Sequence, residues 1–221
     1  MSIPSIKHFG KNTLGRDFVV GDLHGCFHML QESLVERNFD PVAGDRLFSV
    51  GDLVDRGPHS KLCLEWLGLP YFHSVRGNHE QMAIDATHGF YDYRNYFANG
   101  GAWFLDMPQH KRNIYADQFE FLPIAIEIET ENGLVGIVHA NCPTDQWMDM
   151  HDGLRGQNAE SFAMMCMWDR SRYNSGRTDI IGGVDKVIVG HTPVQESQIR
   201  GNVHYIDTGA VFGKRLTIIQ L

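Results

Sequence analysis

The side chains best suited to chemistry lie in the stretch Gly-Asp-Leu-Val-Asp-Arg-Gly, residues 51–57, which follows the apolar run 47–50. Two carboxylates this close together in a cleft need neutralising, so a cation is the natural partner of Asp52 and Asp55. Arg56 supplies a planar guanidinium that suits an anion such as phosphate. A solvated turn would also use glycine and aspartate. The stretch alone therefore predicts a site only if other parts of the chain repeat its chemistry.

Four other places do repeat it, each directly after a short apolar run: Gly-Asp-Leu-His-Gly at 21–25, Gly-Asn-His-Glu at 77–80, His139, and Gly-His at 190–191. Ligands of open α/β sheets gather at the carboxyl ends of the strands. We expect one crevice to receive six ligands: Asp22, His24, Asp52, Asn78, His139 and His191. Oxygen and nitrogen ligands without thiolate suit Mn, Fe or Zn. Six ligands exceed the need of one open ion, so two ions sharing a carboxylate fit better, as in phosphate ester chemistry.

The elements that must position these side chains alternate between strands and helices. Apolar runs predict strands at 17–20, 47–50, 71–75, 124–129, 134–138, 187–189, 203–206 and 216–220. Helices are expected at 26–38, from Pro58 to about 67, and from 78 to about 87. Three successive strand–loop–helix units indicate a largely parallel sheet. Residues 89–121 show no clean period, and 148–158 are expected to form a polar loop or an irregular excursion.

Composition places the chain among ordinary globular proteins. Its 221 residues are 43% hydrophobic and 21% charged, and we expect one domain over residues 1–221. A net charge of −8 argues against nucleic acid as a partner. No apolar stretch has the length of a signal peptide or a membrane span. The four cysteines form no CxxC pair, so we expect neither a zinc ribbon nor disulfides, and a reducing cytoplasm is the expected location.

The three Gly-Asp and Gly-Asn motifs, in this order, resemble the signature of the phosphoprotein phosphatases within the calcineurin-like metallophosphoesterases. The chain is most similar to the small phage-lambda-type and bacterial serine/threonine phosphatases. The likeness extends to Gly100-Gly101, to Trp-Asp-Arg at 168–170 and to the stretch 205–210, and so covers nearly the whole chain. It implies an α/β fold with a central β-sandwich flanked by helices, and an active site at the strand ends.

The resemblance also implies a role for each site residue. Asp22 and His24 resemble ligands of a first metal, Asp52 the bridging carboxylate, and Asn78, His139 and His191 ligands of a second. Arg56, Arg170 and Asn78 would hold the phosphate oxygens. His79 resembles the general acid, with Asp55 as its partner. Two divalent ions are implied, Mn²⁺ first, with Fe or Zn as alternatives, and hydroxide bridging them would attack phosphorus directly.

The function implied is a metal-dependent phosphatase acting on phosphoserine and phosphothreonine in proteins, with phosphotyrosine left open. A dinucleoside polyphosphate hydrolase of the same superfamily is the alternative, and a silent phosphate-reading module is a third. His24 and Asp55 favour the phosphoprotein branch, because the hydrolase branch lacks the histidine and has a small residue in place of the aspartate. One departure is Asn141-Cys142, where related small phosphatases often carry Asp-Tyr. The aromatic stretch 90–104 is either a satellite core or a specificity surface, and the core is favoured.

Overall fold

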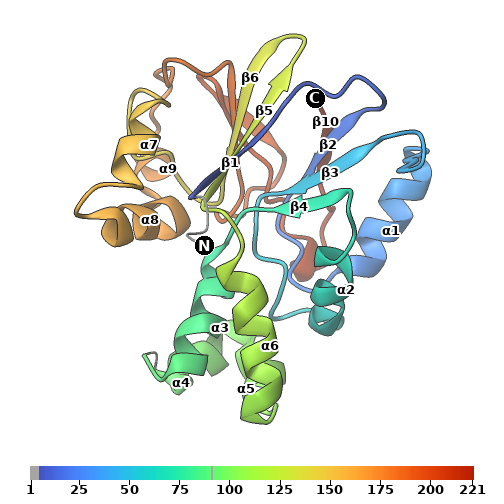
Figure 1. Cartoon of the computed structure of the whole chain (residues 1–221), viewed down its shortest axis with the longest axis vertical. Coiled ribbons are helices and arrows are strands. Elements are labelled where there is room, and N and C mark those ends of the chain that lie inside the picture. Colours follow the sequence, from blue (N-terminus) through green and yellow to red (C-terminus); the bar gives the residue numbers. More distant parts are fainter. Residues whose placement is uncertain (1–4, 91) are drawn as a thin grey trace.

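The computed structural model describes residues 5–90 and 92–221, and two β-sheets form its centre (Figure 1). The six-stranded sheet has the order β1-β5-β6-β7-β9-β8 and the four-stranded sheet the order β10-β2-β3-β4. The strands are β1 Ile6–Phe9, β2 Asp17–Val20, β3 Arg46–Ser49, β4 Phe72–Ser74, β5 Ala125–Thr130, β6 Gly133–Val138, β7 Lys186–Val189, β8 Gln198–Arg200, β9 Val203–Tyr205 and β10 Ile218–Gln220.

The two sheets pack face to face as a sandwich. Apolar side chains from both sheets form one buried cluster between them, including Val19 and Phe48 from the smaller sheet and Ile126, Ile137 and Ile188 from the larger. Burial of this kind stabilises a fold by about 25 cal/mol per Å² of apolar surface. The β-sandwich implied by the resemblance is therefore confirmed. The three strand–loop–helix units form parallel strands β2, β3 and β4, as predicted, while strands β5 to β9 belong to the second sheet.

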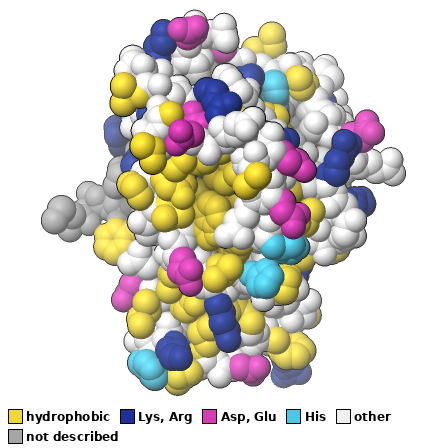
Figure 2. All heavy atoms as spheres, turned by 90° about the vertical axis from the view of Figure 1, so that its right-hand side faces the viewer, with side chains coloured by type: hydrophobic (Ala, Val, Ile, Leu, Met, Phe, Trp, Pro, Cys, Tyr) yellow, Lys and Arg dark blue, Asp and Glu magenta, His cyan; other side chains and the backbone are white. Residues whose placement is uncertain are grey.

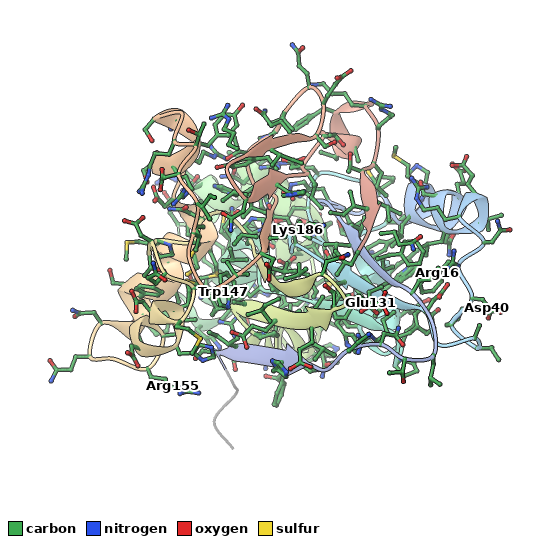
Figure 3. The ribbon with its side chains drawn as sticks, turned by 90° about the horizontal axis from the view of Figure 1, so that it is seen from above. Arg16, Asp40, Glu131, Trp147, Arg155 and Lys186 are labelled. Atoms are coloured by element: carbon green, nitrogen blue, oxygen red, sulfur yellow. The ribbon has the colours of Figure 1, made fainter. Side chains whose placement is uncertain are left out.

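Strand direction brings the expected site together. Strands β2, β3 and β4 run parallel, as do β6 and β7, so each set delivers its carboxyl ends to one edge. Strand β10 pairs antiparallel with β2, and β5 and β6 form an antiparallel hairpin, for which Asn132-Gly133 is a typical turn sequence. Glu131, labelled in Figure 3, lies in that hairpin turn.

Helices pack against the sandwich in two groups. Helices α1 Phe27–Glu36, α2 Cys63–Leu67, α3 Asn78–His88 and α6 Gln109–Glu120 contribute to a core cluster that also includes Phe18 and Leu47 of the four-stranded sheet. Helices α7 Asp149–Gly153, α8 Ala159–Trp168 and α9 Ser171–Asn174 lie on the side of the six-stranded sheet (Figure 1). Trp147, labelled in Figure 3, is buried between these helices and the six-stranded sheet, with its ring against Gly136.

Several local predictions need correction. Residues 89–121 are mainly helical: α4 Tyr93–Tyr96, the π-helical turn η2 Phe97–Gly101, α5 Ala102–Leu105 and α6. The expected polar loop at 148–158 contains α7. The helix expected from Pro58 begins as the 3₁₀ turn η1 Ser60–Leu62, which continues into α2, and another 3₁₀ turn, η3 Ala210–Phe212, follows β9. Strands β1 and β8 were not predicted.

Three further observations concern the surface, the helices and the cysteines. Figure 2 shows apolar side chains gathered on the face that carries α1 and α2, where Leu34, Val35, Trp66, Leu69 and Tyr71 line a groove of about 360 Å³. Within the described residues, no helix is long and apolar enough to cross a membrane. All four cysteines are buried free thiols.

Candidate active site

Loops after five strands bring the predicted site residues into one buried cluster. The eight candidates other than the arginines are at most 6% exposed: Asp22, His24, Asp52, Asp55, Asn78, His79, His139 and His191. Five site residues have a left-handed backbone that only glycine adopts readily, with φ of 41° at His24, 52° at Asp52, 72° at Asp55, 66° at Arg56 and 64° at His191. Strained backbone of this kind persists where the surrounding structure holds it, typically at functional sites.

Asp52 lies at the centre of the cluster. Its Oδ2 is 3.4 Å from His24 Nε2 and 3.9 Å from His79 Nε2, while its Oδ1 is 3.3 Å from His139 Nε2. Two groups of three side chains each bring their ligand atoms within 4.8 Å of one another: His24, Asp52 and His79, and Asp52, His139 and His191. Asp52 belongs to both groups, which is the position expected of a shared carboxylate.

Backbone carbonyls orient two of the imidazoles. His24 Nδ1 lies 2.8 Å from the Val54 oxygen, and His139 Nδ1 lies 2.7 Å from the Val50 oxygen. A carbonyl oxygen accepts only from a protonated nitrogen, so in both rings Nδ1 carries a proton and Nε2 is the nitrogen available to a metal ion. Such a contact fixes the tautomer and the direction of a metal-binding histidine. Both Nε2 atoms face Asp52.

The remaining predicted ligands lie beside these groups. Asn78 Oδ1 is 2.9 Å from His139 Nε2. The Asp22 carboxylate accepts the backbone N–H of His191 on both oxygens, at 3.1 and 3.0 Å, and it belongs to neither of the two groups. His191 Nε2 lies 3.2 Å from the Trp168 oxygen. All six predicted ligands therefore lie together, and the backbone N–H of His191 holds the Asp22 carboxylate in place.

Glycines make room for the two carboxylates. A Cβ atom at Gly77 would collide with Asp52 Oδ1, and one at Gly190 would collide with Asp22 Oδ1. These close approaches explain why the Gly-Asn and Gly-His pairs need glycine, since no other residue lets the backbone come so near. The carboxylates are thus held in cradles that a side chain would fill.

The charges of the cluster fit a divalent cation. Burial raises the pKa of Asp22 well above its usual range, and the nearby Asp207 adds to the effect. Burial lowers the pKa of His24 and of His191 to about 3, so both imidazoles are neutral and able to act as ligands. Neutral imidazoles beside buried carboxylates match the nitrogen and oxygen donors that divalent transition metals prefer. The donor set therefore suits a metal centre.

His79 is paired with a second buried carboxylate. Its Nδ1 lies 2.6 Å from Asp55 Oδ2, and both side chains are almost fully buried. Its backbone N–H donates to Asp52 Oδ1 at 3.0 Å. The Asp55 contact keeps the Nδ1 proton in place and turns Nε2 toward Asp52. This nitrogen is placed where it can face either a substrate oxygen or a cation.

Two exposed arginines flank the cluster. Arg56 Nη1 lies 2.7 Å from His24 Nε2, and its guanidinium stands 5.9 Å from the centre of the Phe212 ring. Arg170 Nη2 donates to the His191 carbonyl at 3.1 Å. Guanidinium groups beside a buried donor set of this kind match the charge and planar geometry of phosphate oxygens.

Comparison with known proteins identifies the family. The sequence model of the family named "Calcineurin-like phosphoesterase" matches residues 18–195, the segment that carries every strand-end motif. The chain belongs to the calcineurin-like phosphoesterase family. It is 40% identical over 216 residues to the "Serine/threonine-protein phosphatase 1" of Salmonella typhimurium, covering 92% of this chain and 91% of that protein.

Two further similarities concern a different named activity. The phosphoesterase is 28% identical over 229 residues to the "Bis(5'-nucleosyl)-tetraphosphatase PrpE [asymmetrical]" of Bacillus cereus, covering 91% of this chain and 89% of that protein. The crystal structure of "a putative diadenosine tetraphosphatase" superposes with a TM-score of 0.67 at 22% identity, covering 98% of this chain and 96% of that one. At that identity the superposition supports the fold alone.

The phosphoesterase site also uses residues that the sequence did not single out. Glu80 is fully buried and accepts the backbone N–H groups of Gly77, Asp52 and Leu53. Tyr96 and Trp103 donate to Asp55. Glu80 could have been found from its place in the Gly-Asn-His-Glu motif. The two aromatic residues lie in a stretch without periodicity, and no sequence signal connects them to Asp55.

Proposed function

We propose that this phosphoesterase is a metal-dependent protein phosphatase that hydrolyses phosphoserine and phosphothreonine monoesters. The observation that carries the proposal is the pair of His79 and Asp55, 2.6 Å apart and buried beside the Asp52-centred ligand groups. Serine and threonine leave as basic alkoxides, which require a proton from a positioned acid. The serine/threonine phosphatase named among the relatives supports the same substrate class.

We propose two divalent metal ions as the cofactor, with Mn²⁺ first and Fe or Zn as alternatives. Two ligand groups that share Asp52 support a dinuclear centre. Asp22 and His24 would hold one ion, Asn78, His139 and His191 the other, and Asp52 both. When bound, such ions stabilise charge on phosphoryl oxygens and activate water as a nucleophile.

The other residues of the site bind and protonate. Arg56 and Arg170 would hold phosphate oxygens together with the Asn78 amide, and orient the phosphorus for in-line attack. His79 would donate its Nε2 proton to the departing oxygen, while Asp55 holds the Nδ1 proton. The proposal takes residues 1–221 as a single metallophosphoesterase domain, since both sheets contribute ligands to the same site.

A dinucleoside polyphosphate hydrolase is the second candidate, because the Bacillus cereus relative carries that name. Its leaving group would be a nucleotide, whose terminal phosphate is stable without an added proton. An acid held by a buried carboxylate gives little advantage there. The pairing of His79 with Asp55 therefore favours the phosphomonoesterase.

A substrate panel tests the choice. The enzyme is stripped with a chelator, reloaded separately with Mn²⁺, Fe²⁺, Zn²⁺ and Mg²⁺, and assayed on phosphoserine, phosphothreonine and phosphotyrosine peptides and on diadenosine tetraphosphate. We expect the highest kcat/KM on phosphoserine or phosphothreonine peptides with Mn²⁺. A higher kcat/KM on diadenosine tetraphosphate would overturn the proposal in favour of the second candidate.

A further inference from the structure

We propose that Trp103 and Tyr96 are positioning residues, which lock the Asp55 carboxylate so that His79 is aimed at the departing oxygen. The inference rests on the proposed function, because it gives His79 the task of protonating a leaving group. It assigns a purpose to residues 93–105, which comprise α4, η2 and α5 and are called the arm below.

The Asp55 carboxylate accepts three hydrogen bonds in a fully buried position. Its Oδ2 lies 2.6 Å from His79 Nδ1. Its Oδ1 accepts the Trp103 Nε1–H at 2.6 Å and the Tyr96 hydroxyl at 3.2 Å. Rotation of the carboxylate would take Oδ1 away from both donors. The two aromatic residues therefore keep Oδ2 directed at the imidazole.

Both donors are themselves held in place by packing. Tyr96 is fully buried, with its ring 5.9 Å from that of Phe104 in an edge-to-face arrangement. Trp103 meets Tyr115 of α6 at 5.4 Å in the same way. Burial, reinforced by Asp55, raises the pKa of the Tyr96 phenol well above its usual range, so its hydroxyl keeps the proton that it donates.

The two glycines of the arm fit the same purpose. Gly100 has a φ of +99°, and its carbonyl accepts the backbone N–H of Arg56 at 3.4 Å. A Cβ at Gly100 would lie 2.6 Å from that same nitrogen. A Cβ at Gly101 would lie 2.6 Å from ring atoms of Tyr96. Gly100-Gly101 thus lets the arm pack closely against the ring of Tyr96, which donates to Asp55, and against the backbone of Arg56.

The arm also holds a strained turn. Asp55 and Arg56 are consecutive residues with φ of 72° and 66°, a left-handed conformation that is strained in residues other than glycine. Tyr96 and Trp103 donate hydrogen bonds to Asp55, and the Gly100 carbonyl accepts one from the Arg56 backbone. These three hydrogen bonds with the arm help to hold the strained turn in its conformation.

The test removes the donors one at a time. Tyr96→Phe deletes only a hydroxyl, and Trp103→Phe deletes the indole N–H. Tyr93→Phe is the matched control, since its hydroxyl lies on the same arm but donates to the Ala86 carbonyl. Each Mn²⁺-loaded enzyme is assayed on phenyl phosphate, which has a basic leaving group, and on nitrophenyl phosphate, which has a weakly basic one.

We expect kcat on phenyl phosphate to fall roughly tenfold in Tyr96→Phe and in Trp103→Phe, the size expected when a hydrogen bond to a charged group is lost. The loss on nitrophenyl phosphate should be less than about twofold, with KM and metal content unchanged, because only proton donation suffers. Tyr93→Phe should match the native enzyme on both esters. Equal losses on the two esters in Tyr96→Phe would overturn the inference, even if Trp103→Phe failed to fold.

A double-mutant cycle checks that the effect passes through Asp55. In an Asp55→Asn background, Tyr96→Phe should cause no further loss on phenyl phosphate, because the group it positions is already altered. Full additivity of the two losses would refute the positioning role. Both tests use aryl esters, so they remain decisive if the peptide panel shows that the proposed protein substrates are wrong.

Discussion

Replacing Glu80 with glutamine should weaken the fold at the centre of the site. Glu80 Oε2 accepts the backbone N–H groups of Gly77 at 2.8 Å and Asp52 at 3.0 Å, and Oε1 accepts that of Leu53 at 2.8 Å. Glutamine has one acceptor oxygen, so at least one of these buried N–H groups must face the amide nitrogen. Such an unsatisfied donor costs about 1–3 kcal/mol.

This free energy converts into a melting temperature. In chains of 150–250 residues, each kcal/mol shifts Tm by about 2–4 °C, so Glu80→Gln should lower Tm by roughly 2–12 °C. Thermal unfolding in the presence of chelator isolates the effect from metal binding. Glu36→Gln is the control, because it makes the same substitution at a side chain that is 76% exposed. If the two variants melted at the same temperature, the three hydrogen bonds accepted by Glu80 would contribute nothing measurable to stability, and the prediction would be wrong.

Three further predictions follow from the geometry. Asp52→Asn should lower metal content, measured by elemental analysis, more than any other single ligand change, because Asp52 belongs to both ligand groups; equal content in variant and native enzyme would contradict the dinuclear centre. Arg56→Ala and Arg170→Ala should each lower kcat roughly 10²–10³-fold, as for a preorganised donor, with metal content unchanged; native activity in Arg170→Ala would remove it from the site. Burial, aided by Lys7 and Arg46, lowers the pKa of His73 from 6.5 to about 4. Since the unfolded chain then binds the proton more readily, the free energy of unfolding should fall between pH 6.5 and 4, and fall less in His73→Phe, as measured by urea unfolding; identical pH slopes would contradict the shift.

The parts of the site that the sequence predicts are those encoded locally. Asp22, His24, Asp52 and Asn78 directly follow apolar runs, and the glycines beside them mark tight turns, so their place at strand ends can be read without a structure. Their meeting depends only on parallel strands ending at a common edge. The assignment of roles among them, and of His79 as the acid, stays a prediction.

Other features could not be read because they depend on distant partners. Strand β8 is three residues long and pairs with β9, so it carries too little pattern to identify. Helices α4 and α5 have four residues each and are separated by Gly100 in a left-handed conformation, which destroys any helical period. Trp103 reaches Asp55 across 48 positions of the chain, and only the packing of the arm reveals the contact.

The left-handed backbone at the site has a consequence for protein engineering. His24, Asp52, Asp55, Arg56 and His191 each hold a conformation that costs of the order of 1–3 kcal/mol. Glycine at any of these positions would relieve that cost, so a library screened only for thermal stability would tend to select glycine there. The same substitutions would delete proposed ligands, an acid partner and a phosphate-binding group. A screen of this chain for heat resistance should therefore hold these five positions fixed or select for turnover at the same time.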